Sequence, residues 1–421
     1  MKLSKLFTKT RKTTVDEGQS KNADLLVKAG YIYKEMAGVY SYLPLGLKVF
    51  KNIEQIIREE MNKTGALEMS MSSLQDPAIW KSTNRWIDNP DVDVWFTTKL
   101  KNETELGLGF THEEPITRIM SEYISSYRDL PFSAYQFQTK FRNETRAKSG
   151  IMRTREFVMK DLYTFCKDDA EHAVVYEELK NAYINTYKRL GIGDSTYVTF
   201  ASGGVFSKYS HEFQTVCDAG EDEIYIDDEK HIAINKEVYT DEVLADLGVN
   251  KNTLRVAKAS EVGNIFSLGT KFSSALGLKY KNEAGEEKDV VMGSYGVGPA
   301  RVMGVMVELL SDDKGLSWPA AVAPYSLHIV SLHKSENENA YAYAKDLYEE
   351  LTREGVEVLW DDRHVGAGEK LNDADLLGMP MRVLVSEKSI LAGGVEIKER
   401  KSEQSEVITR EQLMTMYTKV C

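Results

Sequence analysis

The residues best suited to chemistry lie between Lys140 and Lys160. This stretch holds two acids, Glu144 and Glu156, and seven basic residues: Lys140, Arg142, Arg146, Lys148, Arg153, Arg155 and Lys160. The whole chain has a formal net charge of −12, so a local surplus of basic side chains needs an explanation. Arginines on paired strands can clamp a polyphosphate, and Phe157 offers a ring on which a base can stack. A solvated β-hairpin explains the same composition, and composition alone leaves both interpretations open.

Hydrophobic periodicity predicts the elements that must position these side chains. Helices are expected from Leu45 to Met61, from about Asp169 to Leu190, and from Pro299 to Leu310. The first has apolar residues at helical spacing, Val49, Phe50, Ile53, Ile57 and Met61, and the second has an expected buried stripe, Tyr176, Leu179, Tyr183, Tyr187 and Leu190. A strand ending near Phe110 should lead through Thr111 into a helix that begins with two glutamates. The expected strands span 66–74, 106–110, 133–144 and 153–165, and a last strand reaches Gly293 before a glycine turn.

The strand over 133–144 has two unlike faces. Tyr135, Phe137, Thr139 and Phe141 alternate with Gln136, Gln138, Lys140, Arg142 and Glu144. Successive side chains of a strand point to opposite sides of a sheet, so the first set suits a core. On alternation alone we expect the second set to face solvent.

Length and composition limit the class of protein. A chain of 421 residues favours two or three domains, and the proline-rich segment WPAAVAPYS predicts a linker before a small α/β domain with a mostly parallel sheet. Residues 222–262 are polar, acidic and predicted to be irregular. No apolar run reaches the length of a membrane span, and three scattered cysteines predict neither a disulfide framework nor a zinc site. The N-terminus lacks the apolar core of a signal peptide, so we expect a cytoplasmic protein.

Two stretches resemble signature motifs of class II aminoacyl-tRNA synthetases. FRNE, followed by a loop and RTREF, is similar to the second signature, and GSYGVGPARVMGVMVE is similar to the third. Further stretches resemble prolyl-tRNA synthetases of the bacterial type: LVKAGYIYKEMAGVYSYLPLG, FTHEEPIT, YQFQTKFRNE, MRTREFVMKDLYTF, SHEFQ, GNIFSLGTKFS and WPAAVAP. The resemblance covers nearly the whole chain. The chain departs from that family's usual residues at Ser72, where a proline is common, and at Ser267, where a glutamine is common.

The resemblance implies a fold of the α/β class. An α+β catalytic domain, with an antiparallel sheet flanked by helices, would precede an α/β anticodon-binding domain. The implied parts are a first part of the catalytic core at 1–221, a short remnant in place of an editing insertion at 222–262, the second part of the core with the linker at 263–324, and the anticodon-binding domain at 325–421. The family also implies a homodimer without membrane attachment.

The resemblance further implies roles for single side chains. Arg142 would bind both the amino-acid carboxylate and the α-phosphate of ATP, and Arg301 would bind the γ-phosphate. Further ATP contacts are implied for Glu144, at the adenine amino group, for Phe157, stacked on the ring, and for Arg153 and Thr270. Proline contacts are implied for Thr111, Glu113, His211 and Ser294. Contacts with tRNA are implied for Arg146, at the acceptor end, and for Arg363 and Lys370, at the anticodon.

The implied reaction is ATP-dependent attachment of L-proline to its tRNA through prolyl-adenylate, with Mg²⁺ entering with ATP and no metal held by the protein alone. Two alternatives stay open. One is a class II enzyme that charges tRNA with threonine, serine, glycine or histidine. The other is a paralogue that binds tRNA without catalysis. From the residues alone, His211 fits a binding pocket and a packed core equally well, and Thr111 with Glu113 resembles an ordinary helix cap.

Overall fold

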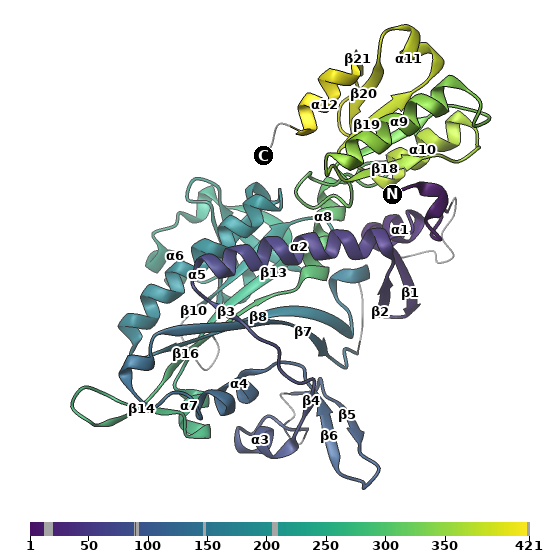
Figure 1. Cartoon of the computed structure of the whole chain (residues 1–421). Coiled ribbons are helices and arrows are strands. Elements are labelled where there is room, and N and C mark those ends of the chain that lie inside the picture. The colour runs from purple at the N-terminus through teal and green to yellow at the C-terminus, as the bar shows by residue number, and fades with distance from the viewer. Residues whose placement is uncertain (12–19, 88, 90–91, 146–148, 204–208, 419–421) are drawn as a thin grey trace. The chain divides into compact units, whose positions relative to one another are not determined.

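The computed structural model describes residues 1–11, 20–87, 89, 92–145, 149–203 and 209–418 (Figure 1). The chain divides into two compact units. The core unit consists of Ala37–Val39 and Glu54–Val305. The terminal unit consists of Met1–Met36, Tyr40–Ile53 and Met306–Cys421. Most of the residues predicted to do chemistry lie in the core unit.

The core unit is built on a nine-stranded sheet with the order β10-β9-β12-β11-β13-β16-β8-β7-β3. Its central strands are antiparallel neighbours: β13 (Arg255–Gly269), β16 (Val291–Val297), β8 (Glu156–Cys166) and β7 (Phe132–Phe141). The outer strands are β3 (Leu67–Glu68), β9 (Thr196–Ser202), β10 (Tyr209–Val216), β11 (Asp222–Asp227) and β12 (Ile232–Asn235). Only β3–β7 and β12–β9 are parallel among the pairings of these strands. The predicted antiparallel sheet is therefore confirmed.

Helix α5 (Asp169–Arg189) packs on the central strands β8, β13 and β16 (Figure 1). Asp168 caps its N-terminus, and the carboxylate of Asp168 accepts from the backbone N–H of Glu171. Past its C-terminus, Gly191 adopts the left-handed conformation that commonly follows a helix. Its predicted buried stripe is confirmed at Leu179, Tyr183 and Tyr187, which are at most 1% exposed. The helix therefore covers the middle of the sheet.

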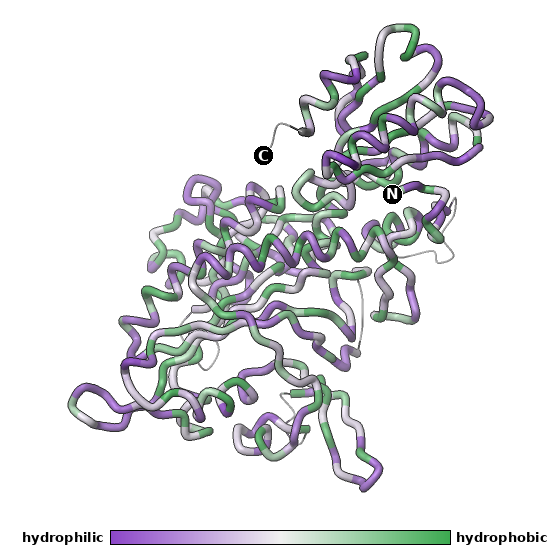
Figure 2. The backbone as a smooth tube through the Cα atoms, viewed as in Figure 1, coloured by the Kyte–Doolittle hydropathy of each residue, from purple (hydrophilic) through white to green (hydrophobic). Residues whose placement is uncertain are grey.

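Helix α2 (Pro44–Lys63) has the predicted amphipathic pattern, with green and purple alternating along its length in Figure 2. Its buried apolar side chains are Leu45, Val49, Phe50, Ile53, Ile56, Ile57 and Met61. At one end of the sheet, α4 (Glu113–Met120) packs against α7 (Lys271–Leu276), and α7 in turn contacts β13 and β16. The start of α4 is thus held close to the ends of the central strands.

A small three-stranded sheet, β4 (Leu74–Gln75), β6 (Glu105–Leu108) and β5 (Phe96–Lys99), packs with α3 (Pro77–Ser82) in the core unit. Its core contains Ile79, Trp80, Trp86, Trp95 and Phe110. The strand predicted over 66–74 is wrong, because its ends pair in two different sheets as β3 and β4. Between them the chain bonds to β7 without a continuous ladder: the Met69 N–H donates to the Tyr135 carbonyl and the Met71 N–H to the Gln136 side chain.

Two further predictions for the core unit are corrected. Residues 222–262 are not irregular: they form β11, β12, α6 (Asp241–Leu247) and the first half of β13, all but the helix belonging to the main sheet. The predicted glycine turn after Gly293 is a continuous strand through Val297, and only Gly298 separates it from α8 (Pro299–Leu310). The core unit also contains β14 (Lys279–Lys281) and β15 (Glu287–Asp289). The helix α1 (Lys21–Lys28) and the strand β1 (Ile32–Met36) belong to the terminal unit, and β2 (Val39–Tyr42) spans the division between the units.

The terminal unit contains a five-stranded sheet with the order β18-β17-β19-β20-β21. The predicted parallel strands are β17 (Leu327–Ser331), β18 (Val358–Asp361) and β19 (Met381–Val385). The strands β20 (Val395–Glu399) and β21 (Glu406–Ile408), which add antiparallel pairs, were not predicted. Its helices are α9 (Asn339–Arg353), α10 (Ala367–Leu377), α11 (Glu387–Leu391) and α12 (Arg410–Thr418). No helix within the described ranges is long and apolar enough to cross a membrane.

Candidate active site

A cavity of about 320 Å³ lies over β7, β8, β13 and β16. It brings together eight of the residues predicted to bind proline or ATP: Thr111, Glu113, Arg142, Glu144, Arg153, Phe157, Ser294 and Arg301. These residues come from segments up to 190 positions apart, so the sheet is what gathers them. The cavity also contains carboxylates and an amide that were not predicted, among them Asp161, Glu261 and Asn264.

Glycines in β16 and directly after it leave the floor of the cavity open. Gly296 and Gly298 belong to the lining, where a side chain would occupy the space open to a ligand. At Gly293 a Cβ atom would lie 2.7–2.8 Å from His172, Tyr295 and Thr164, closer than real Cβ contacts allow. The glycine-rich sequence therefore serves close packing and an open floor.

Arg142, just beyond β7, carries a half-buried cation into the cavity. Its guanidinium carbon lies 5.3 Å from the centroid of the Phe157 ring. Among the described residues, the side chain forms only long hydrogen bonds, of 3.4 and 3.5 Å, to the Phe110 carbonyl. Burial lowers the pKa of Arg142, and the nearby charge of Arg301 lowers it further. No carboxylate of the described residues forms an ion pair with Arg142, so the side chain is available to an anion.

Arg301 and Arg153 are held more firmly. Arg301, in the first turn of α8, donates to the carbonyls of Met152 at 2.9 Å and Glu261 at 2.8 Å, and its guanidinium lies 3.4 Å from the Glu261 carboxylate. Arg153 forms ion pairs of 2.9 Å with both Glu144 and Glu221. Cations and carboxylates thus alternate along this part of the cavity, an arrangement suited to phosphates and their counter-ions.

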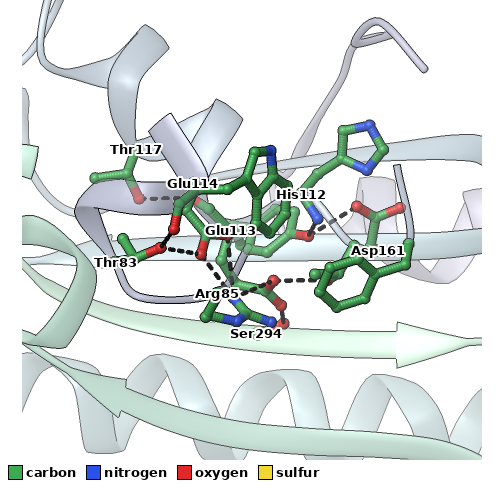
Figure 3. A network of polar contacts seen from close by, with 12 residues as sticks. Thr83, Arg85, His112, Glu113, Glu114, Thr117, Asp161 and Ser294 are labelled. Atoms are coloured by element: carbon green, nitrogen blue, oxygen red, sulfur yellow. Dashed lines mark hydrogen bonds and ion pairs between the residues drawn. The ribbon is translucent and has the colours of Figure 1, made fainter. Parts of the chain in front are cut away.

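Glu113 is the centre of a second cluster (Figure 3). One of its oxygens, Oε2, accepts from the Thr111 hydroxyl at 2.6 Å and from Arg85 at 3.3 Å. The other, Oε1, accepts from Ser294 at 3.3 Å. Burial opposes ionisation of Glu113, but Arg85 and the Thr111 hydroxyl outweigh burial and lower the pKa of this carboxyl. The cavity therefore contains an ionised carboxylate with fixed orientation.

A buried polar network supports the loop that carries Thr111 and Glu113. The Lys140 ammonium lies 2.9 Å from Asp161 and 2.6 Å from Nδ1 of His112, and Nε2 of His112 lies 3.0 Å from the Ser72 carbonyl. Burial lowers the pKa of His112 to about 4, with Lys140 adding to the effect. The imidazole is therefore neutral: Nδ1 accepts from the lysine and Nε2 donates to Ser72.

This network corrects the prediction for the polar face of β7. Gln136 and Lys140 are 0% exposed, although alternation favoured a solvent-facing set. They are accommodated because each finds a partner: Gln136 donates to Asp161 at 2.9 Å and accepts from the Met71 N–H. Alternation identified the residues on one face, but could not tell that both faces are covered.

Two predicted site residues lie outside this cavity. Nδ1 of His211, on β10, lies 2.8 Å from the Tyr176 hydroxyl oxygen, and the His211 ring packs against Phe200. It lines a separate cavity of about 490 Å³, and burial lowers its pKa to about 4. Thr270 is exposed at the start of α7, where its carbonyl accepts from Ser273. Their predicted contacts with proline and ATP gain no support from this geometry.

The residues predicted to contact tRNA have mixed positions. Arg146 lies outside the described residues. In the terminal unit, Arg363 forms ion pairs with Asp361 at 2.7 Å and with Asp373 at 2.8 Å. Lys370 is 0% exposed and donates to the Ser331 carbonyl at 2.7 Å. Direct contact of Lys370 with an anticodon would require its ammonium to leave these buried acceptors.

Known families match both halves of the chain. Residues 96–309 match the tRNA synthetase class II core domain (G, H, P, S and T), and residues 326–419 match an anticodon binding domain. The chain is 35% identical over 442 residues to the proline--tRNA ligase of Agrobacterium fabrum, covering 98% of this chain and 99% of the relative. The chain belongs to the proline--tRNA ligase family. The enzyme of that name from Rickettsia bellii is 36% identical over 421 residues, covering 97% and 96%.

Solved structures of prolyl-tRNA synthetases share the fold. That from Cryptosporidium parvum, complexed with L-proline and AMP, has a TM-score of 0.75 at 18% identity and covers 94% of this chain and 73% of that one. That from Giardia lamblia, in complex with prolyl-adenylate, has 18% identity and covers 93% and 74%. The predicted class II core, anticodon-binding domain and family are thereby confirmed. The boundaries at residues 221, 262 and 324 remain predictions.

Proposed function

We propose that this chain attaches L-proline to its tRNA in two steps, with ATP as the energy source and prolyl-adenylate as the intermediate. The observation that carries the proposal is one cavity holding both an oriented, ionised carboxylate, Glu113, and two arginines, Arg142 and Arg301. The first suits the cationic imino group of proline, and the others suit the carboxylate and the phosphates. The membership of the chain in the proline--tRNA ligase family supports this assignment.

In the first step the proline carboxylate attacks the α-phosphorus of ATP, the bond to the β-phosphate breaks, and pyrophosphate leaves. Arg142 would neutralise the charge on the reacting oxygens, because it lines the cavity and has no ion-pair partner among the described carboxylates. Arg301 would hold the terminal phosphate. Catalysis is then positioning and charge neutralisation, and no protein nucleophile is required.

In the second step a terminal ribose hydroxyl of the tRNA attacks the activated carbonyl. The bond from the carbonyl carbon to the adenylate oxygen breaks, and AMP leaves while the hydroxyl proton is lost. For the adenine ring we propose stacking on Phe157 and a contact from Glu144, with Arg153 holding Glu144 in place. The predicted contacts of His211 and Thr270 would require movement toward the cavity, since neither belongs to its lining.

The cavity also fits Mg²⁺ that enters with ATP. Mg²⁺ is usually held by one or two carboxylates together with substrate phosphates. Glu261, beside Arg301, is the carboxylate placed for this, and the Asn264 side chain donates to it at 2.9 Å. Within the part of the chain that the structure describes, no three His, Cys, Asp or Glu residues gather to hold a metal by themselves. The ion would neutralise phosphate charge.

For the assembly we propose a homodimer that works in the cytoplasm on a tRNA specific for proline. The strand β3 is the last strand at its end of the main sheet, and Leu67 on it is 68% exposed. An apolar side chain on an edge strand suits pairing with a second copy. The anticodon-binding domain would bind the tRNA, with Arg363 and Lys370 as proposed contacts and Arg146 proposed at the acceptor end.

Charging of tRNA with threonine, serine, glycine or histidine, and tRNA binding without catalysis, are the alternatives. The relatives that cover nearly the whole chain are proline ligases, and the arginines of the cavity are intact, which disfavours both. The discriminating test is exchange of pyrophosphate into ATP, compared across these amino acids.

A separate prediction concerns alanine, which is smaller than proline and fits any pocket that admits it. A difference of one or two methylenes gives about 10–200-fold discrimination, so we expect measurable activation of alanine. Residues 222–262 form strands of the main sheet and one seven-residue helix, which leaves little chain for a hydrolytic domain. We therefore expect no hydrolysis of preformed alanyl-tRNA of the proline type. Deacylation well above the spontaneous rate by pure protein would contradict this expectation.

A further inference from the structure

The segment after α3 brings one arginine, Arg85, to the start of α4. Its Nη1 atom lies 3.3 Å from Oε2 of Glu113 and 3.0 Å from each oxygen of Glu114 (Figure 3). Its guanidinium carbon lies 5.6, 5.4 and 5.2 Å from the ring centroids of Trp80, Phe110 and Phe272. Two carboxylates and three aromatic rings thus fix this guanidinium, which is more than a surface ion pair requires.

We propose that Arg85 is a positioning residue for recognition of the amino acid. It holds one oxygen of Glu113 and supplies the positive charge that keeps Glu113 ionised, so that the other oxygen is ready for the imino cation of proline. This role of Arg85 rests on the proposed function, because it presumes that Glu113 binds that cation.

The hydrogen bonds around Glu113 indicate which oxygen would meet the substrate. Oε2 is shared by Thr111 at 2.6 Å and Arg85 at 3.3 Å. Oε1 accepts only from Ser294, at 3.3 Å, among the described residues. A carboxylate oxygen accepts about two hydrogen bonds, so Oε1 retains room for an N–H of the imino group. Arg85 and Thr111 therefore orient the carboxylate from its occupied side.

Glu114 has a different task from its neighbour. It is 0% exposed, does not line the cavity, and accepts from Arg85 and from Thr83 at 2.8 Å. Its position makes it the anchor of Arg85 rather than a contact of the substrate. Burial raises the pKa of Glu114 to about 7 against the opposing effect of Arg85.

The charges of this cluster favour a cationic ligand. Two buried carboxylates, Glu113 and Glu114, face the single cation Arg85. The next cation, Lys140, is already paired with Asp161 at 2.9 Å. Burial raises the pKa of Glu114 to about 7, so Glu114 is ionised in part at neutral pH, and the ionised carboxylates then outnumber Arg85. Glu113 can therefore accept the positive charge that the imino group brings and that an uncharged ring oxygen would not.

The titratable and charged groups that face Glu113 come from several elements. Those of its own loop and helix are His112 and Glu114, and the segment after α3 contributes Arg85. The sheet contributes Lys140 and Arg142 from the β7 side and Asp161 and Tyr163 from β8. Arg85 is the cation with the largest effect on the pKa of Glu113.

The test compares wild-type protein with Arg85→Leu in proline-dependent pyrophosphate exchange. The KM for proline should rise by about 10–100-fold, as for loss of a hydrogen bond to a charged group, while the KM for ATP stays within about twofold. Without Arg85 the pKa of Glu113 rises, so Glu113 becomes protonated at a higher pH. The acid limb of kcat/KM for proline should therefore move to higher pH.

Two further variants keep the proposal falsifiable. Arg85→Lys retains the charge but not the planar fork, and should show a smaller rise in KM with a nearly unchanged acid limb. If Arg85→Leu does not fold, the test uses Arg85→Lys alone: the KM for proline should rise while the acid limb of kcat/KM stays nearly in place. The matched control is Arg255→Leu, which removes an exposed arginine paired with Asp228 at 2.9 Å and should leave all parameters unchanged.

The outcomes separate the two levels of the proposal. If wild-type protein exchanges normally and Arg85→Leu affects proline and ATP equally with no pH shift, Arg85 is only structural and the inference is overturned. If wild-type protein shows exchange with another amino acid but none with proline, the proposed function itself is wrong. Tetrahydrofuran-2-carboxylate, which carries oxygen in place of the ring nitrogen, should compete weakly with proline in wild type, and strong competition would also contradict the charge argument.

Discussion

Replacing Arg142 with alanine should reduce proline-dependent pyrophosphate exchange by about 10²–10³ or more, the effect of removing one donor to a developing charge. The expectation rests on the position of the guanidinium, which lines the cavity and lies over Phe157. Among the described residues it forms only long hydrogen bonds to a carbonyl. One side chain would serve both reacting groups, so both kcat and the KM for proline should suffer.

A matched control for this variant is Arg118→Ala, which removes an exposed arginine from α4. It should exchange pyrophosphate at the wild-type rate. Because Arg142 forms no ion pair with a described carboxylate and only long side-chain hydrogen bonds, thermal unfolding of Arg142→Ala should resemble that of the wild type. Near-normal exchange in Arg142→Ala would show that another residue meets the phosphate.

Replacing Glu113 with glutamine should raise the KM for proline by about 10²–10³, as when one partner of a buried charge pair is removed. Glutamine has nearly the same shape and still accepts from the Thr111 hydroxyl, so the change isolates the charge. The KM for ATP should change little. Since glutamine does not titrate, the part of the acid limb of kcat/KM that reports Glu113 should disappear.

The control for this second variant is Glu103→Gln, at an exposed position paired only with Lys99. Exchange by Glu103→Gln should be indistinguishable from that of the wild type. If Glu113→Gln bound proline as tightly as the wild type, the imino group would have to find its partner elsewhere, with Asp161 as the nearest alternative in the lining of the cavity.

Periodicity was sufficient for the elements that bury one face. The helical stripe of α2 at Val49, Ile53 and Ile57 and that of α5 at Tyr183 and Tyr187 were predicted and are buried. In these helices one face packs on a core and the other faces water, so the spacing of apolar residues is enough to predict which side chains are buried. Periodicity also located β7 and β8, which are long, regular strands that pair with each other along nearly their full length.

Periodicity failed where both faces of an element are covered. Lys140 and Gln136 share a polar face with Arg142, and nothing local indicates that Asp161 and His112 will satisfy them in the interior. The prediction of a glycine turn in place of β16 failed for a related reason. Glycine is common in turns, but here it is required by close contacts with side chains distant in the sequence, such as His172. Pairing across the sheet is the missing information.

The candidate site shows the same division. The motifs around Arg142, Arg301 and Glu113 could be recognised because their residue types stand at fixed short spacings. Arg85 has no such neighbours: it lies 28 positions before Glu113 and meets it only through the packing of the small sheet and α3 against α4. A residue that acts through another gives no local signal in the sequence.

The central claim is that this cavity activates proline with ATP, and one measurement tests it most directly. Purified protein is incubated with ATP, labelled pyrophosphate and, in separate reactions, proline, threonine, serine, glycine, histidine or no amino acid. We expect label to enter ATP rapidly with proline, far more slowly with the others, and at the blank level for Arg142→Ala with proline. Exchange that is equally slow with every amino acid, or fastest with one other than proline, would contradict the account.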